Sequence, residues 1–347
     1  MTGPTSGEAQ EAGVGAGVAI DVHAHVVPSS LLADLAARDI HGFSAERTGE
    51  GWVVTVPGSG PTRPIGARMT DAGPRRDWMS RTGVTEQVLS PWMDVQSGGL
   101  APPAARDWAL RLNDAMAETA AELGGGTRVL ASVPAHDGET AAAALEEVRS
   151  RPEAAGVLLT TSPGGLALHD PGFEPFWAAA EQGGVPVVLH PPTCGPSGAL
   201  PTLGGLGNVH GRPIDNTIAV TELILHGLLD RYPRLTLILV HGGGFLPYQA
   251  ARVDGGYRTR ESFAGELARE RPSDYLRDLY YDTAALSGPA IAFLTRLVGA
   301  DRVLLGSDYP FALSDPQPVR TVLDAGLEPG ETGAILSANA DKILRRP

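Results

Sequence analysis

The sequence contains almost no cysteine and almost no lysine. Cys194 is the only cysteine among the 347 residues, so no disulfide can form within the chain, and we expect a reducing compartment, the cytoplasm. Lys342, close to the C-terminus, is the only lysine. Neither a P-loop nor a lysine Schiff base can therefore be the basis of its function.

Long apolar runs and basic clusters are also missing. No apolar run reaches the roughly 20 residues that a membrane-spanning helix requires. The formal net charge is −13 and the basic residues are scattered, which disfavours nucleic acid or an anionic membrane as a partner. Residues 1–17 are small and polar, and we interpret them as a disordered tail. Residues 18–347 show no break in composition, which favours one barrel-sized catalytic domain.

Short apolar runs alternate with stretches that have helical spacing of apolar residues. The runs cover residues 18–26, 86–91, 128–134, 155–160, 186–191, 235–242, 279–286 and 302–310. The helical stretches include residues 104–123, 139–149, 173–182, 216–229 and 289–298. Continuous Val, Ile and Leu runs are typical of strands covered on both faces, and their alternation with helices indicates parallel pairing through crossovers.

Eight such units predict a (β/α)₈ barrel. The alternative is an open, doubly wound sheet, but the glycine-rich turn expected after its first strand is missing. The interval 28–82 is too long for a simple crossover and contains a strand-like piece, residues 51–58. We interpret it as an insertion between the first two strands that forms a lid near the barrel mouth.

Polar side chains interrupt the first apolar run at every second position. Side chains two apart on a strand point to the same side, so Asp21, His23 and His25 are predicted to share one face. Burying two imidazoles without partners costs roughly 2–7 kcal/mol for each group. A bound cation at the end of this strand would remove that cost.

Three further polar residues end later strands. His190 follows the fifth run, His241 the sixth and Asp308 the eighth, each at the carboxyl end, where barrel enzymes place catalytic groups. Imidazole nitrogen and carboxylate oxygen suit zinc and tolerate manganese, cobalt or iron. The pattern therefore predicts a site for one divalent cation, with zinc as the first choice and manganese as the second.

Four motifs in this order resemble the branch of the amidohydrolase superfamily named after aminocarboxymuconate semialdehyde decarboxylase. They are IDVHAHVVP (20–28), LHPPT (189–193), LVHGGGFLPY (239–248) and LLGSDYPF (304–311). The resemblance runs from about residue 20 to the C-terminus. It implies that His23, His25, His190 and Asp308 bind the metal, and that His241 stands beside it as an acid/base, with Asp308 as the alternative proton carrier.

The resemblance also implies contacts to a small anionic carboxylic acid. Members of the family commonly form dimers in which an arginine reaches the neighbouring site, and the matching residue here is Arg252; an ordinary position on a helix surface is the alternative. A second arginine, from the insertion, corresponds to Arg68 or Arg63, and we favour Arg68. Trp92 and Phe311 follow strand ends and are expected to line the pocket, with core packing as the alternative for each.

The superfamily's two-metal hydrolases bridge their ions with a carboxylated lysine, which this chain cannot supply because Lys342 lies far from the central strands. One metal ion is therefore expected. The branch favours non-oxidative decarboxylation of an unsaturated or aromatic carboxylic acid. Hydrolysis of an ester, lactone or amide, or a hydratase reaction, is the second hypothesis, and a metal-stabilised scaffold without catalysis is the third.

Overall fold

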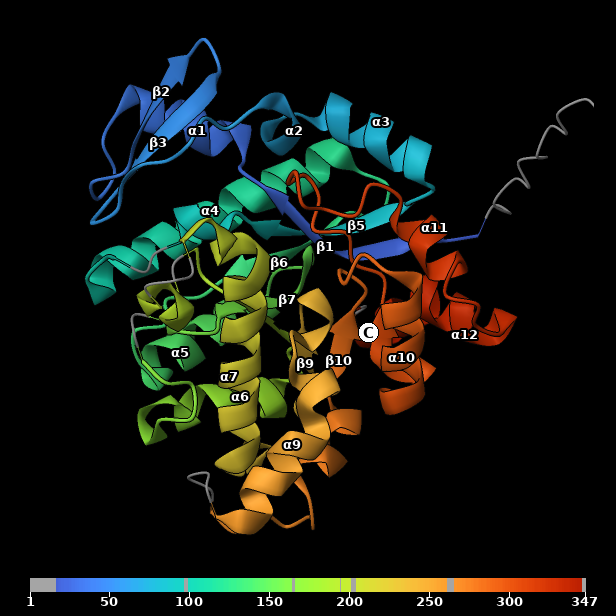
Figure 1. Cartoon of the computed structure of the whole chain (residues 1–347). Coiled ribbons are helices and arrows are strands. Elements are labelled where there is room, and N and C mark those ends of the chain that lie inside the picture. The colour runs from blue at the N-terminus through green and yellow to red at the C-terminus, as the bar shows by residue number, and fades with distance from the viewer. Residues whose placement is uncertain are drawn as a thin grey trace, which may run out of the picture.

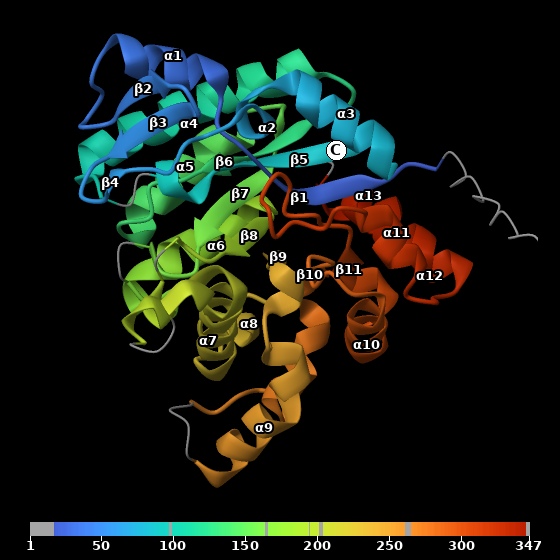
Figure 2. The same cartoon turned by 45° about the horizontal axis from the view of Figure 1, so that its top comes forward.

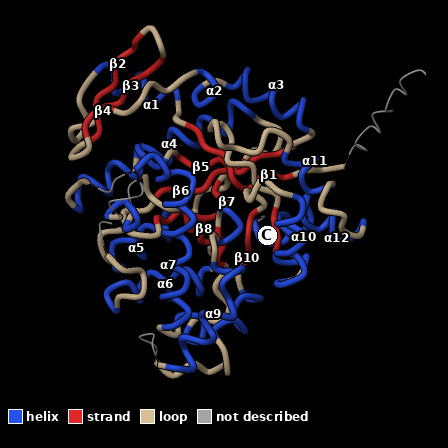
Figure 3. Tube along the Cα trace, in the orientation of Figure 1, coloured by secondary structure: helices blue, strands red, loops and turns tan. Residues whose placement is uncertain are grey.

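Eight parallel strands form one sheet at the centre of the computed structural model, which describes residues 17–96, 99–163, 166–193, 195–200, 204–260 and 265–344 (Figure 1). The strands are β1 (Ile20–Val26), β5 (Glu86–Pro91), β6 (Arg128–Ser132), β7 (Ala154–Thr160), β8 (Val187–His190), β9 (Leu237–Leu239), β10 (Tyr280–Asp282) and β11 (Val303–Leu304). Each strand lies within or overlaps one predicted apolar run. They pair in chain order, and Figure 3 shows them gathered at the centre with helices around them.

The sheet closes on itself between its first strand and the segment that follows its last strand. Ala24 and Tyr309 form a parallel bridge there. Three backbone hydrogen bonds cross the join, from the amides of Val22, His25 and Asp308 to the carbonyls of Leu305, Tyr309 and His23, at 2.8, 2.7 and 2.8 Å. The (β/α)₈ barrel prediction is therefore confirmed, and the open doubly wound sheet is excluded.

Several strands are shorter than their apolar runs, and two of these shortened strands are followed by residues of the rim. The runs at 235–242 and 302–310 pair as strands only over Leu237–Leu239 and Val303–Leu304. Beyond these short strands the chain turns into left-handed backbone, with φ of 55° at His241 and 63° at Asp308. Such a residue cannot continue a strand, so the chain turns at the barrel rim and carries both side chains there.

Helices surround the barrel and cover its outer face. They are α3 (Ala72–Thr82), α4 (Pro102–Leu123), α5 (Gly138–Arg149), α6 (Glu174–Gly183), α7 (Arg212–Leu225), α8 (Leu228–Arg231), α9 (Leu246–Thr259), α10 (Gly288–Val298), α11 (Pro318–Leu323), α12 (Pro329–Gly333) and α13 (Asn339–Leu344). On α4, the buried Trp108, Leu112 and Met116 repeat at helical spacing, which explains why this segment forms an amphipathic helix. Among the described helices, none is both long and apolar enough to cross a membrane.

The apolar core has two layers. A small cluster inside the barrel takes side chains from all eight strands, including Ile20, Val88, Leu130, Leu158, Val188, Ile238, Tyr280 and Leu304. A larger cluster lies between the strands and the surrounding helices, and contains Leu89, Leu159, Leu189 and Leu239. Neighbouring positions of one strand thus alternate between the two layers, as a pleated strand covered on both faces requires.

A buried polar network supports the join from outside the barrel. The Asp21 carboxylate accepts hydrogen bonds from Ser307 Oγ (2.6 Å) and Gln87 Nε2 (2.9 Å). Arg75, on α3, donates to Gln87 Oε1 at 2.9 Å and to the His25 carbonyl at 2.6 Å. Asp21 therefore does not share the environment of the strand's two histidines, contrary to the prediction, because the β1–β5 register shifts between Asp21 and Ala24.

The connection between β1 and β5 contains its own small sheet. Its elements before α3 are α1 (Ser29–Ala37), β2 (Ser44–Thr48), β3 (Gly51–Val56), β4 (Gly60–Pro61) and α2 (Ala67–Thr70). The strand-like piece at 51–58 corresponds to β3, which pairs antiparallel with β2 and β4. Figures 1 and 2 show this sheet at one edge of the molecule, near α1 and α4.

One aromatic stack attaches this connection to the barrel's outer layer. Phe43, just before β2, lies flat against Trp108 of α4, with the ring centroids 3.7 Å apart and the planes 5° from parallel. Trp108 also donates its indole N–H to the Val95 carbonyl at 2.8 Å. Both rings are almost completely buried, so the stack fixes the start of the small sheet against α4.

We expect Phe43→Ala to lower the free energy of unfolding by about 3–5 kcal/mol, because it removes a buried ring and leaves a cavity. Phe43→Leu keeps most of the volume and should lose clearly less. Chemical denaturation of the three proteins measures both changes. A loss below about 1 kcal/mol for the alanine variant would contradict the packing described.

Candidate metal centre and active-site cavity

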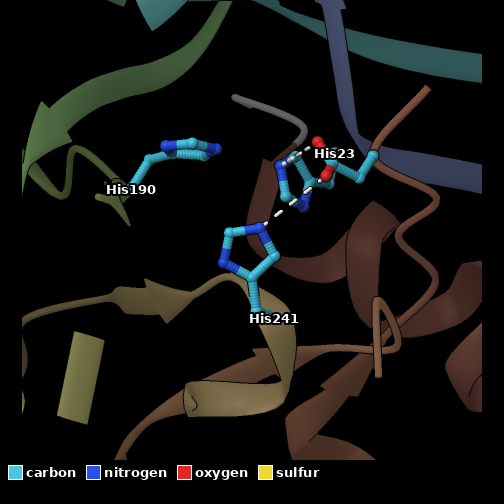
Figure 4. A group of neighbouring side chains, drawn as sticks. His23, His190 and His241 are labelled. Atoms are coloured by element: carbon cyan, nitrogen blue, oxygen red, sulfur yellow. Dashed lines mark ion pairs between the residues drawn. The ribbon is translucent and has the colours of Figure 1, made fainter. Parts of the chain in front are cut away.

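Five polar side chains from four strand ends meet at one rim of the barrel. His23 and His25 lie on β1 and His190 ends β8, while His241 and Asp308 follow β9 and β11. One ligand atom from each of His23, His190, His241 and Asp308 lies within 4.8 Å of the others. His25 Nε2 joins this group, 3.1 Å from His23 Nε2 and 3.3 Å from Asp308 Oδ1. Figure 4 shows the three labelled histidines turned toward one another.

Hydrogen bonds to the outer ring nitrogens direct lone pairs into this centre. His190 Nδ1 lies 2.7 Å from the Pro191 carbonyl, which can only accept, so the proton is on Nδ1 and Nε2 carries a lone pair. His190 Nε2 is buried and has no hydrogen-bond partner among the described residues. His23 Nδ1 lies 2.6 Å from Asp282 Oδ2, which orients its Nε2 toward Asp308 in the same way.

Burial and neighbouring charges set the protonation of the centre. Burial lowers the pKa of His25 to about 4, and burial together with nearby histidines holds the pKa of His190 well below its usual value. Burial opposes the charge on His23 and Asp308 too, but their mutual attraction outweighs it. The pKa of His23 rises to about 10, with Asp282 contributing, and that of Asp308 falls well below its usual range.

These residues fit a divalent cation. Two neutral imidazoles and an ionised carboxylate are the protonation states that metal ligation requires. The negative environment that raises the pKa of His23 favours a metal ion as much as it favours a proton. Asp308 Oδ1, like His190 Nε2, is buried without a hydrogen-bond partner among the described residues. The donor set suits zinc and accommodates manganese, so it indicates a metal site without selecting the ion.

Asp282, at the end of β10, connects the centre to the loop of His241. Besides holding His23, its carboxylate accepts hydrogen bonds through Oδ1 from the amides of Gly242 (2.8 Å) and Ala284 (3.1 Å). Sequence analysis did not single out this residue. The available signal was a carboxylate inside an otherwise apolar strand, which needs partners when it is completely buried.

His241 has a different hydrogen-bond environment from the other histidines. The buried Asn216, on α7, places its Nδ2 3.0 Å from the Val240 carbonyl and 3.2 Å from His241 Nδ1. Because that amide group donates, His241 Nδ1 accepts, and the neutral ring carries its proton on Nε2. This nitrogen lies 3.8 Å from Asp308 Oδ2. Sequence analysis missed Asn216 because an asparagine within a helix gives no pattern.

Glycines make room for close backbone approach around the centre. After His241, Gly244 has a φ of 67°, and a Cβ there would lie 2.3 Å from the Pro213 carbonyl oxygen. At Gly306, a Cβ would lie 2.8 Å from that of Asp282 and 3.1 Å from that of His23. The glycine run after His241 therefore permits the packing of this loop against the start of α7.

A cavity of about 720 Å³ opens beside the centre, with His190 and Asp308 in its wall. Arg63, between β4 and α2, lines the cavity and lies over the rings of Trp92 and Phe311, 5.5 and 5.6 Å from their centroids. Phe311 lines the cavity as well, whereas Trp92 is 2% exposed beneath Arg63.

The other two predicted arginines lie outside this cavity. Arg68, which we favoured over Arg63, lies over the Tyr309 ring and lines a separate pocket behind Phe311. Arg252 is exposed on α9 and does not line the cavity within one chain. Of the insertion arginines, the structure thus brings Arg63 to the cavity.

A closed parallel barrel with clustered histidines and a carboxylate at its carboxyl-terminal rim defines the class of metal-dependent barrel enzymes. The chain belongs to the amidohydrolase family, whose model matches residues 20–346.

Three proteins to which the chain is similar are decarboxylases. It is 28% identical over 257 residues to 2-amino-3-carboxymuconate-6-semialdehyde decarboxylase of Dictyostelium discoideum, covering 74% of this chain and 71% of that one. It is also 28% identical over 257 residues to gamma-resorcylate decarboxylase of a Polaromonas species, covering 71% of this chain and 79% of that one. The fold matches 5-carboxyvanillate decarboxylase of Novosphingobium aromaticivorans, solved with manganese and 4-hydroxy-3-methoxy-5-nitrobenzoic acid, with a TM-score of 0.78, 21% identity and coverage of 95% and 96%.

We expect Asp282→Asn to weaken metal binding by about 10–100-fold. An amide that keeps its oxygen on Gly242 presents its N–H₂ to His23 Nδ1, so the imidazole proton moves to the nitrogen that faces the centre. Competition with a chelator measures the affinity. Asp301→Asn, at an exposed carboxylate, is the matched control and should bind metal like the wild type. Equal affinity in both variants would contradict the role given to Asp282.

Proposed function

We propose that this protein is a metal-dependent, non-oxidative decarboxylase of an unsaturated or aromatic carboxylic acid. The observation that carries the proposal is the rim centre of His23, His25, His190, His241 and Asp308, which opens into a cavity with an arginine, Arg63, in its wall. A cationic wall and a metal centre in one cavity suit a small anionic substrate. The relatives named above, which are decarboxylases of such acids, support the same reaction class.

We propose that His23, His25, His190 and Asp308 hold one divalent cation, with zinc as first choice and manganese as second. The inward lone pairs of His23 and His190 and the low pKa of His25 support these ligands. Manganese in the 5-carboxyvanillate decarboxylase structure makes the second ion a close alternative. When bound, such an ion acts as a Lewis acid toward substrate oxygen atoms.

His241 is the proposed acid/base. In a non-oxidative decarboxylation, the bond between the carboxylate carbon and its neighbour breaks, the electron pair stays on the substrate carbon, and that carbon gains a proton as carbon dioxide leaves. His241 supports this role because Asn216 keeps the ring proton on Nε2, which faces Asp308 and the centre. A ring that carries its proton on the inner nitrogen is a donor rather than a metal ligand.

Arg63 is the proposed cationic contact for the anionic substrate within one chain, with Phe311 against the substrate's flat face and Trp92 supporting Arg63 from below. Arg68 is the less favoured candidate because it lies at the pocket behind Phe311. The turn between β3 and β4 lines the same cavity with Ser59 and Gly60, which supports the role of residues 28–82 as a lid.

We expect the metal-loaded protein to release carbon dioxide from at least one member of a panel of hydroxybenzoates and muconate semialdehydes. His241→Ala should keep its metal but lose activity by about 100-fold or more, because the proton donor is missing, whereas His23→Ala should lose both. Carbon dioxide release and elemental analysis measure these outcomes. Hydrolysis of ester, lactone or amide substrates without any carbon dioxide release would overturn the proposal in favour of a hydrolase.

We further propose a homodimer in the cytoplasm in which Arg252 reaches the partner's cavity. Phe245, Tyr248 and Arg252 recur at helical spacing around α9, and the first two expose 40% and 78% of their surface. Large exposed aromatic residues on one helix face support a protein interface. The single cysteine, Cys194, supports the reducing compartment.

Arg252→Ala and His23→Ala should each be inactive alone. After mixing and exchange of subunits, we expect activity to recover to about a quarter of the wild-type level, because random pairing leaves one complete site in half of the dimers. Turnover of the mixture, measured beside each variant alone, gives the result. Absence of any recovery in a mixture whose subunits do exchange would argue against a role across the interface.

A further inference from the structure

Two side chains on the cavity wall formed by the loops after β5 and β6 each keep one polar atom without a partner. Gln96 follows the helical turn Met93–Val95, and His136 lies between β6 and α5. Both line the same cavity as His190 and Asp308. Gln96 Nε2 and His136 Nδ1 are buried, and neither has a hydrogen-bond partner among the described residues. A buried polar atom without a partner costs free energy, so each marks a place for a polar group of a ligand.

The amide of Gln96 is held by its oxygen. Ser132 Oγ donates to Gln96 Oε1 at 2.6 Å. Ser132 is itself fixed by Asn113, which accepts from its amide at 2.8 Å and donates to its carbonyl at 3.0 Å. With the oxygen end occupied, the end left for a ligand is the N–H₂ group, which donates.

The ring of His136 provides a hydrogen-bond acceptor rather than a donor. Its Nε2 lies 2.5 Å from the Leu100 carbonyl, which can only accept, so the proton of the neutral ring is on Nε2. Nδ1 therefore carries a lone pair and accepts. The wall thus holds one donor, Gln96 Nε2, and one acceptor, His136 Nδ1, and because both atoms are buried, a small movement of each side chain is needed to meet a ligand.

Hydroxyl groups complement this pair better than other common substituents, because a hydroxyl both donates and accepts. A carboxylate only accepts and leaves the neutral His136 unpaired, and an ammonium only donates and leaves Gln96 unpaired. Asp94, whose side chain accepts a hydrogen bond from Thr193 Oγ1, lies on the same wall and disfavours a second carboxylate there.

We propose that Gln96 and His136 bind hydroxyl groups on the edge of the substrate that faces away from the metal centre. This inference rests on the proposed function, and it adds a determinant of specificity to it. His241 follows β9, and in the strand order of the closed barrel β5 stands four places from β9 and β6 three places. A flat acid whose carboxylate lies near His241 therefore directs its far edge toward the loops of β5 and β6.

The test compares the binding of benzoate, 2-hydroxybenzoate and 3,4-dihydroxybenzoate to the manganese-loaded protein by calorimetry. We expect 3,4-dihydroxybenzoate to bind at least about tenfold more tightly than benzoate, because its hydroxyl groups lie away from the carboxylate. The hydroxyl of 2-hydroxybenzoate lies beside the carboxylate, and its affinity should not change when the wall is altered.

Gln96→Met removes the donor, and His136→Phe removes the acceptor together with the hydrogen bond to the Leu100 carbonyl. In each variant we expect the preference for 3,4-dihydroxybenzoate over benzoate to fall to about threefold or less, with benzoate affinity within about twofold of the wild type. Gln182→Met, at an exposed glutamine on α6, is the matched control and should keep the full preference. Thermal unfolding confirms that each variant is folded.

An unchanged preference in both folded variants would overturn the inference, and so would a wild-type protein that binds all three acids equally. Carbon dioxide release is measured separately with the same acids. If the preference exists and is lost in the variants but no acid is decarboxylated, the hydroxyl site stands and the proposed reaction fails. If carbon dioxide is released but the variants keep the preference, the proposed reaction stands and the hydroxyl site fails.

Discussion

The join between β1 and the segment after β11 is the constraint on which the centre depends. The first and last strands of the barrel come from opposite ends of the chain, and their side chains meet only because the sheet closes. The amide of Asp308 donates to the carbonyl of His23, so a single backbone hydrogen bond sets a carboxylate beside an imidazole. Asp21 and Ser307 strengthen the same join with buried side-chain hydrogen bonds. The residues of the centre therefore come together only when the barrel closes.

The buried charged groups around the centre are compensated by partners inside the barrel, at the strand ends and on the helix side. Inside the barrel, the carboxylate of Asp308 faces His23, whose pKa is raised to about 10, and the imidazoles of His25 and His190, which burial keeps neutral. One step outward, Asp282 holds His23 and the loop of His241. On the helix side, the charge of Arg75 lies near that of Asp21, with Gln87 between them. Each charged group thus has a neighbour of opposite charge or a hydrogen-bonding partner. Such partners allow ionised residues to be buried in an interior of low dielectric.

The fold was predictable because its signal is repeated. Eight apolar runs of similar length, five of them followed by a stretch with helical spacing, leave few architectures open. The polar ends of those runs likewise identified the convergent residues, since carboxyl ends of parallel strands share one rim. Strand lengths were less predictable: the turns at His241 and Asp308 depend on left-handed backbone, which composition does not reveal in a non-glycine residue.

The supporting residues were not predictable, for a physical reason. Asp282, Asn216 and Gln96 act through hydrogen bonds mostly to partners distant in the chain, and such bonds need no periodic pattern. The sequence likewise carries no signal for which of Arg63 and Arg68 lines the cavity, because both follow the small sheet and only the direction of the loop decides it. The register shift in β1 separated Asp21 from the histidines despite their regular spacing.

The left-handed backbone at His241, followed by three consecutive glycines with positive φ, has an evolutionary consequence. A loop that already uses unfavourable conformations, and whose glycines leave no space for a Cβ at Gly243 and Gly244, tolerates almost no change. New substrates must then be accommodated by the opposite half of the rim, where the loops after β5 and β6 and the turn between β3 and β4 contain none of the five residues of the centre. The barrel thereby divides into a fixed half, which keeps the chemistry, and a variable half, which can acquire new selectivity.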